Sequence, residues 1–229
     1  MPKKIVAVMQ PYFFPYAGYF RLLHMADHFL IFDCVQFPRR GYVHRCTLPQ
    51  DHPVWLTLPL AKQALDKKIY ELTFKKNARI ILNQRLDSIE WIQKASSPIA
   101  IQLREYLYGP LPNVVDFLEQ GLRLTAQILD IEIVISRSSE LNLDDQLKGQ
   151  DRVLAAVQQL NGSHYLNSPG GRELYKTIAF SQAGIKLLFL NHYHGLFYNM
   201  LHALMTYPAE QIKTDILQQC LMGNDKLLN

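Results

Sequence analysis

Residues 10–20 combine prolines, aromatic residues and a glycine, which suits the wall of a binding pocket. They read QPYFFPYAGYF. Prolines restrict the backbone here, while Gly18 lets another group approach the chain closely. Aromatic packing in the core would explain the same composition, but such a dense cluster directly after a predicted strand favours a binding loop. The predicted ligand contacts from this stretch are Gln10, Tyr12, Pro15, Gly18 and Tyr19.

A second stretch, residues 33–45, holds one acid and three arginines in the sequence DCVQFPRRGYVHR. Asp33 ends an apolar run, where an unpaired carboxylate would be costly. One arginine could pair with Asp33 while the others bind phosphate or an acyl carboxylate, and a purely structural Asp–Arg pair is the alternative. We predict Asp33 as a base or sugar-orienting residue and Arg45 as a second catalytic residue, which faces the cleft that holds Gln10 and Tyr19. Further ligand contacts are predicted from Gln36, Arg39 and Arg40.

Two more polar stretches, residues 136–140 (SRSSE) and 162–171 (GSHYLNSPGG), supply hydroxyl and backbone N–H groups. Such groups can bind a phosphate or an oxyanion. Each signal is weak alone, because the chain contains neither GxGxxG nor GxxxxGK[ST]. All four stretches follow predicted strands, and loops of this kind meet at one edge of a parallel sheet. The predicted contacts here are Ser138, Ser139, Gly170 and Gly171.

The residue pattern does not favour a metal site, a disulfide or a serine nucleophile. His192, His194 and His202 have no carboxylate at a helpful spacing, so we predict no metal site. The three cysteines show no CxxC spacing and are expected to be buried, reduced thiols. No GxSxG motif is present.

The elements that must position these residues follow from hydrophobic periodicity. A strand at 5–10, a helix at 18–27 and a strand at 28–35 form a βαβ unit, which favours a parallel sheet covered on both faces. We therefore predict an α/β fold, mainly a parallel sheet with flanking helices, in one domain spanning 1–229. Residues 196–229 form its helical C-terminal part. Further strands are predicted at 54–60, 69–74, 131–136, 164–166 and 185–190, and helices at 77–95, 99–106, 113–128 and 150–160.

Composition excludes several classes of protein. Among 229 residues, 48% are hydrophobic and 19% charged, which excludes an intrinsically disordered chain. The basic run 62–79 is interpreted as a solvated face, and because no nucleic-acid-binding motif accompanies it we expect no nucleic acid partner. No apolar segment is long enough for a membrane span, and residues 5–9 are too short for a signal-peptide core. We therefore expect a cytoplasmic protein.

The residues resemble those of the WbqC-like protein family over nearly the whole chain. The likeness rests on Gln10-Pro, Phe14-Pro15, Gly18-Tyr19-Phe20, Asp33-x-Val-Gln-Phe37, Arg45, Trp55-Leu-Thr-Leu-Pro59, Ser138-Ser-Glu-Leu141, Tyr165-Leu, Gly170-Gly171, Tyr175, Asp215 and Gly223. This resemblance implies a role in synthesis of bacterial surface polysaccharide such as the O-antigen of lipopolysaccharide. It suggests a transferase of acyl, aminoacyl or nucleotidyl type acting on a sugar nucleotide or amino sugar. The alternative is a non-catalytic accessory protein that binds a nucleotide or nucleotide-sugar in the same pathway.

The first 37 residues are also similar to the opening of adenylyl-transferring synthetases, which implies a Rossmann-like, nucleotide-binding fold. In those enzymes an H-x-G-H element binds ATP phosphates. Here Tyr16-Ala-Gly-Tyr19 takes its place, so both histidines are replaced by tyrosine. Tyrosine can form hydrogen bonds with a phosphate but cannot carry the positive charge of an imidazolium.

Overall fold

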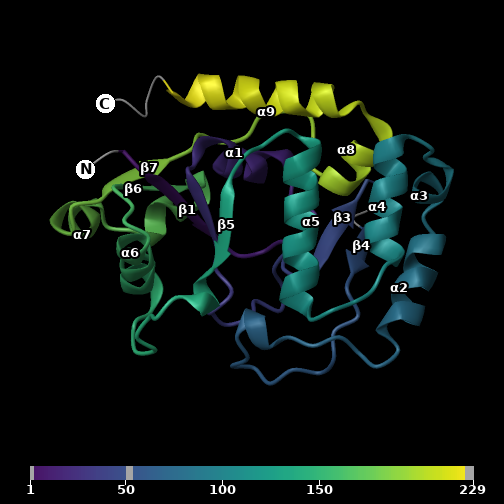
Figure 1. Cartoon of the computed structure of the whole chain (residues 1–229), viewed down its shortest axis with the longest axis horizontal. Helices are drawn as coiled ribbons and strands as arrows, with labels where there is room; N and C mark the ends of the chain where they lie inside the picture. The colour runs from purple at the N-terminus through teal and green to yellow at the C-terminus, as the bar shows by residue number, and fades with distance from the viewer. Residues whose placement is uncertain (1–2, 50–53, 225–229) are drawn as a thin grey trace.

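The core of the molecule is a five-stranded parallel sheet flanked by helices (Figure 1), which confirms the predicted Rossmann-like α/β class. The computed structural model describes residues 3–49 and 54–224. The strands are β1 (Ile5–Met9), β2 (His28–Ile31), β5 (Val134–Arg137), β6 (His164–Asn167) and β7 (Lys186–Phe189), in the order β5-β2-β1-β6-β7. Because every pairing is parallel, all five carboxyl ends lie at one edge.

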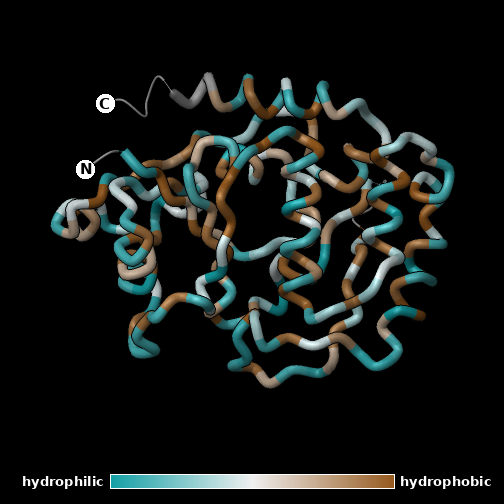
Figure 2. The backbone as a smooth tube through the Cα atoms, in the orientation of Figure 1, coloured by the Kyte–Doolittle hydropathy of each residue, from teal (hydrophilic) through white to brown (hydrophobic). Residues whose placement is uncertain are grey.

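Side chains alternate between the two faces of this sheet and enter two separate cores. On one face, Ala7, Phe29 and Leu166 belong to the larger core, together with side chains from α1 (Ala17–Met25), α5 (Val114–Ile128) and α9 (Ala209–Asn224). On the other face, Val8 and Leu30 pack with α6 (Gly149–Gln159) and α7 (Thr177–Gln182). Figure 2 shows hydrophobic residues alternating with hydrophilic ones along α9, the pattern of a helix with one buried side.

The larger core continues into a second group of elements, drawn on the right of Figure 1. This group contains an antiparallel hairpin of β3 (Arg45–Leu48) and β4 (Val54–Thr57). Four helices pack beside it: α2 (Ala78–Asp87), α3 (Glu90–Lys94), α4 (Pro98–Tyr108) and α8 (Met200–Thr206). Three 3-10 turns complete the fold at Ile69–Glu71, Ser138–Glu140 and Pro169–Leu174.

Several predicted elements differ in the structure. The alternating run 69–74 is not a strand. Ile69 N–H and Tyr70 N–H donate to the carbonyls of Val35 and Asp33, so the loop after β2 holds the start of this run. Within the described residues the run has one isolated β-bridge, between Phe74 and Leu60. Strand β3 was not predicted, β4 ends at Thr57 instead of residue 60, and β5 begins at Val134 instead of 131. The predicted helix 77–95 is divided into α2 and α3, and the C-terminal helical part is divided at Pro208 into α8 and α9. Residues 225–229 of that predicted part lie outside the described residues.

No helix in the described part of the chain is both long and apolar enough to cross a membrane. Cys34, Cys46 and Cys220 are buried and unpaired, as the sequence predicts.

Candidate functional site

Five loops leave the carboxyl ends of the parallel strands at one edge of the sheet, which confirms the predicted convergence. They are residues 10–16, 32–44, 138–148, 168–176 and 190–199. In doubly wound sheets, ligands bind outside this edge where the strand order reverses. Here the order reverses between β1 and β6, so residues 10–16 and 168–176 flank the reversal.

The loop after β1 is held rigidly. Phe14 has a φ of 45°, a left-handed conformation that is uncommon for a bulky residue and persists only when its surroundings enforce it. The buried Phe14 ring packs edge-on against Phe13, with ring centroids 5.1 Å apart. The Tyr19 hydroxyl donates to the Gln10 carbonyl at 2.7 Å, which ties α1 back to the loop. Pro15 is buried as well, so it shapes the loop from within.

Four tyrosines from three of the converging loops form a group that we call the tyrosine cluster: Tyr12, Tyr16, Tyr42 and Tyr198. The ring centroids of Tyr12 and Tyr42 are 5.7 Å apart. Tyr16 reaches Tyr198 through Tyr193, with centroid separations of 5.6 and 5.4 Å. Tyr42 and Tyr198 are 50% and 62% exposed, so these rings are open to a ligand.

Two phenols of the tyrosine cluster, those of Tyr12 and Tyr16, are neutral at physiological pH. Burial raises the pKa of Tyr12, and the neighbouring phenols of Tyr16 and Tyr42 raise it further. Burial also raises the pKa of Tyr16, although the Arg21 guanidinium lowers it in part. A neutral phenol both donates and accepts a hydrogen bond while its ring offers an apolar face. This combination suits a ligand with hydroxyl groups and an apolar ring face.

Arg45 extends the tyrosine cluster with a positive charge. Its guanidinium lies over the Trp55 ring, 4.1 Å from the ring centroid. The Trp55 ring in turn contacts the Tyr42 ring, with the two centroids 5.8 Å apart. Arg45 Nε donates to the Gly41 carbonyl at 3.1 Å and NH2 donates to the Arg40 carbonyl at 2.6 Å. A guanidinium has five N–H donors, so about three remain for an anion.

The partners of Asp33 are serines, and not one of the arginines with which it could have paired. Asp33 is 0% exposed, and its carboxylate accepts hydrogen bonds from Ser138 Oγ at 2.9 Å, Ser139 N–H at 2.8 Å and Ser139 Oγ at 2.6 Å. Ser138 Oγ in turn accepts from the backbone N–H groups of Asp33 and Cys34. The network joins the carboxyl ends of β2 and β5. These hydrogen bonds compensate for burial of the carboxylate without a cation, and they give Asp33, Ser138 and Ser139 partners within the protein.

The other residues predicted from the loop after β2 also have local partners. Gln36 Nε2 donates to the Leu65 carbonyl at 2.7 Å, and an Arg39 amino group donates to the Gln63 carbonyl at 2.6 Å. Both side chains therefore tie this loop to residues 63–65. Arg40 is exposed, and its carbonyl accepts from Arg45.

The predicted glycines have different roles. A Cβ at Gly18 would lie 2.1 Å from the Tyr16 ring and 2.8 Å from Tyr193 Cβ, so the space that this glycine leaves is filled by protein and not by a ligand. A Cβ at Gly171 would lie 2.2 Å from Nδ2 of Asn167, the buried last residue of β6. Gly170 is exposed, with no atom within 4 Å of an added Cβ. Of the three, Gly170 is the one with open space beside it.

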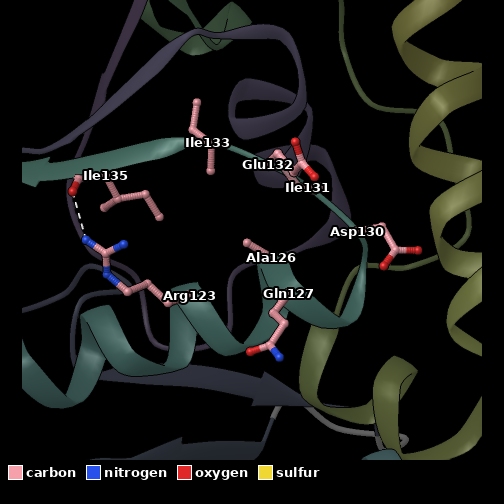
Figure 3. A pocket seen from close by; sticks show the side chains of 8 residues that line it. All are labelled: Arg123, Ala126, Gln127, Asp130, Ile131, Glu132, Ile133 and Ile135. Atoms are coloured by element: carbon pink, nitrogen blue, oxygen red, sulfur yellow. Dashed lines mark hydrogen bonds between the residues drawn. The ribbon is translucent and has the colours of Figure 1, made fainter.

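The described part of the chain also contains cavities, of which the following are well formed. One of about 410 Å³ lies between α5 and the residues leading into β5. Figure 3 shows Ile135 pointing toward the helix and Arg123 hydrogen-bonded to the Ile135 carbonyl. This cavity is at the amino end of β5, on the opposite edge of the sheet from the converging loops. A second, of about 400 Å³, lies between residues 196–197 and α9. The third, of about 470 Å³, lies between β3, the loop after β7, and α8.

Sequence reasoning missed Tyr42, Trp55, Tyr198 and the third cavity. Trp55 could have been suspected from its place in the alternating run VWLTL. It shares a face with Thr57, and a large aromatic residue on the polar face of a strand is unusual unless it binds something. Nothing in the spacing places Tyr198 near Tyr16, because they are 182 residues apart (198 minus 16).

Comparisons with known proteins find similarity over most of the chain. The model of the WbqC-like protein family matches residues 10–203. The chain is similar to the "Uncharacterized protein Rv1507c" of Mycobacterium tuberculosis, with 23% identity over 193 residues that cover 82% of this chain and 83% of that protein. No solved structure matches the chain.

Proposed function

Because this chain belongs to the WbqC-like protein family, we propose that it is a transferase that modifies a sugar nucleotide or an amino sugar during synthesis of bacterial cell-surface polysaccharide, such as O-antigen. In this proposal the sugar contacts the tyrosine cluster and the phosphate contacts Arg45. The ligand is nucleotide-linked or phosphorylated, and it enters at the carboxyl edge of the sheet.

The arrangement of Arg45, Trp55 and the tyrosine cluster is the observation that carries the proposal. Exposed aromatic rings offer faces for the C–H groups of a sugar, and neutral phenols exchange hydrogen bonds with its hydroxyls. The guanidinium over Trp55 supplies an oriented cation for phosphate. Sugar rings and phosphate together are the ligand chemistry that fits this combination of groups.

A second candidate function is a non-catalytic binding protein of the same pathway, and Asp33 favours it. The carboxylate predicted to act as a base is fully buried and accepts three hydrogen bonds from Ser138 and Ser139. A general base must lie within hydrogen-bond reach of the proton that it removes. Tyr16 and Tyr19 also replace the two histidines of the H-x-G-H element. A scaffold that binds a sugar nucleotide without transforming it is consistent with both features.

Thermal-shift measurements with uridine, guanosine and thymidine diphosphate sugars test the proposal. We expect at least one of these ligands to raise the melting temperature of the wild type and to bind Arg45→Ala at least tenfold more weakly, which is about 1.4 kcal/mol. Arg104→Ala is the matched control, because Arg104 is also part-buried and donates to two backbone carbonyls, those of Ile92 and Ala95, but lies on α4 outside the converging loops. We expect the control to bind like the wild type. No shift with any sugar nucleotide, for a protein shown to be folded, would overturn the proposal.

The two candidate functions differ in what happens to the bound ligand. A transferase converts it when an acyl, aminoacyl or nucleotidyl donor is added, whereas an accessory protein returns it unchanged. Mass spectrometry after prolonged incubation with each donor class distinguishes them, with the donor alone as the blank.

A further inference from the structure

The cavity of about 470 Å³ beside the tyrosine cluster has an uncharged but polar lining. Its polar groups come from Thr47, Tyr198, Asn199, His202, Tyr207 and Gln211, and its remaining lining residues are apolar. None of the lining residues is Asp, Glu, Lys or Arg. Burial lowers the pKa of His202, so its imidazole is neutral at physiological pH. A phosphate would find no cation here, whereas a neutral molecule with many hydroxyl groups would find hydrogen-bonding partners.

Asn199 supplies a hydrogen-bond donor that the described residues do not use. Its Oδ1 accepts from the His202 N–H at 2.8 Å and so caps the start of α8. Its Nδ2 is buried and has no hydrogen-bond partner among the described residues. A buried amide donor without a partner costs about 1–3 kcal/mol, so such groups usually have a ligand or a water. Asn199 lines the cavity, and a turn of its side chain from this buried position would bring the amide to a molecule bound there.

Aromatic rings form one side of the same cavity. Phe197 and Tyr207 pack edge to face with centroids 5.2 Å apart, and the His202 ring lies 6.2 Å from Tyr207. Tyr198 and Tyr207 are 62% and 43% exposed. Apolar ring faces next to amide and hydroxyl groups are the surroundings that a sugar ring requires, since a pyranose has apolar C–H faces and a polar rim.

The β3–β4 hairpin connects the cavity to the cation of the proposed phosphate site, because one face of the hairpin contributes to both. Thr47 lines the cavity and is the cross-strand partner of Trp55. Arg45 precedes Thr47 by two residues and lies on the same face of the hairpin, since side chains alternate along a strand. Two residues of a strand span about 7 Å. This is the separation that a sugar ring and its own phosphate require.

We infer that this cavity is the subsite for the uncharged sugar ring of the ligand, with Asn199 Nδ2 donating to an oxygen of the ring or its substituents. The inference rests on the proposed function for the phosphate at Arg45, and it adds which part of the ligand is bound where. The sugar ring lies between the hairpin and α8, and the phosphate lies against the guanidinium on Trp55.

The test uses Asn199→Ser in the full chain, with Asn113→Ser as its matched control. Serine caps a helix about as well as asparagine, so both variants keep the cap acceptor and lose the amide donor. Asn113 caps α5 by accepting from the Asp116 N–H at 2.8 Å and is exposed. Binding of uridine diphosphate N-acetylglucosamine and of uridine diphosphate alone is measured by calorimetry. We expect Asn199→Ser to weaken binding of the sugar nucleotide at least tenfold and binding of the free diphosphate less than twofold. We expect Asn113→Ser to change the affinity for neither ligand. Equal binding of the sugar nucleotide by Asn199→Ser and wild type would overturn the inference.

A second measurement keeps the inference separate from the proposed function. The side-chain amide signals of Asn199 are identified in ¹⁵N spectra by their loss in Asn199→Ser, and they are followed during titration with N-acetylglucosamine, glucose, glucosamine and inorganic phosphate. We expect shifts with a sugar and none with phosphate. If the sugars shift these signals while no sugar nucleotide binds, the subsite stands and the proposed function fails. If no sugar shifts them, the subsite is refuted whatever the sugar nucleotides do.

Discussion

Replacing Asp33 by alanine should destabilise the fold without acting on a ligand directly. Asp33 is fully buried and accepts three hydrogen bonds, so Asp33→Ala leaves three donors of Ser138 and Ser139 without their acceptor. Ser138 is 1% exposed, so its hydroxyl cannot turn to water. Ser139 is exposed and its donors can be hydrated in part. Hydrogen bonds to a charged group contribute about 1.5–3 kcal/mol each, so one full loss and two partial losses amount to about 3 kcal/mol.

Urea unfolding, followed by the fluorescence of Trp55 and Trp91, measures this cost. Asp33→Asn keeps one carbonyl acceptor, and the Ser139 hydroxyl can turn to accept from the new amide, so we expect about half the loss of Asp33→Ala. Asp66→Ala is the control, because Asp66 is an exposed carboxylate; we expect a change within about 0.5 kcal/mol. The reasoning is refuted if Asp33→Ala is as stable as the wild type, whether it still binds the ligand or, as a second possible result, has lost ligand binding. The second result would mean that the carboxylate acts on the ligand.

Three further predictions concern pH and packing. Burial lowers the pKa of His44 to about 4, so the neutral imidazole contributes its full stability above pH 6.5, and this contribution is lost as the pH falls toward 4. His44→Phe should therefore make the melting temperature less dependent on pH between 6.5 and 4. Burial raises the pKa of Tyr19 and Tyr165 well above 10, so stability should be full below pH 10 and fall as the pH rises further, with phenolate absorbance appearing together with unfolding in circular dichroism. Gly18→Ala should cost about 1–3 kcal/mol in urea unfolding, because the new methyl group meets Tyr side chains at 2.1 and 2.8 Å. Gly170→Ala, which meets no atom within 4 Å, should stay within about 0.5 kcal/mol, and equal costs for the two glycines would contradict the packing argument.

The sequence alone determined the parallel sheet and the position of its loops. The apolar runs of β1, β2 and β7 have no polar face, which is expected only of strands covered on both sides. The polar stretches that follow β1, β2, β5 and β6 had to meet at one edge once the strands were parallel. Both inferences need only local pattern and the handedness of βαβ units.

Tertiary structure decided which of the predicted residues bond to one another. Asp33 and Ser138 were both predicted as site residues, but their mutual bond depends on β2 lying beside β5, a pairing between segments 105 residues apart (138 minus 33). The alternating run 69–74 had the pattern of a strand, but among the described residues only Phe74 forms a β-bridge, with Leu60. A strand requires the hydrogen-bonding groups of a neighbour along its whole length.

The cation on Trp55 and the cavity beside it likewise exist only in the folded chain. Arg45 reaches Trp55 because the β3–β4 register sets Thr47 opposite Trp55 and Arg45 two residues away on the same face. Asn199 comes to that hairpin through the packing of α8, from more than 140 residues later in the chain (199 minus 57 is 142). Periodicity predicts which face of each element is apolar, but it carries no information about which distant face covers it. Loop geometry and the packing of side chains from separate elements therefore fixed the candidate site.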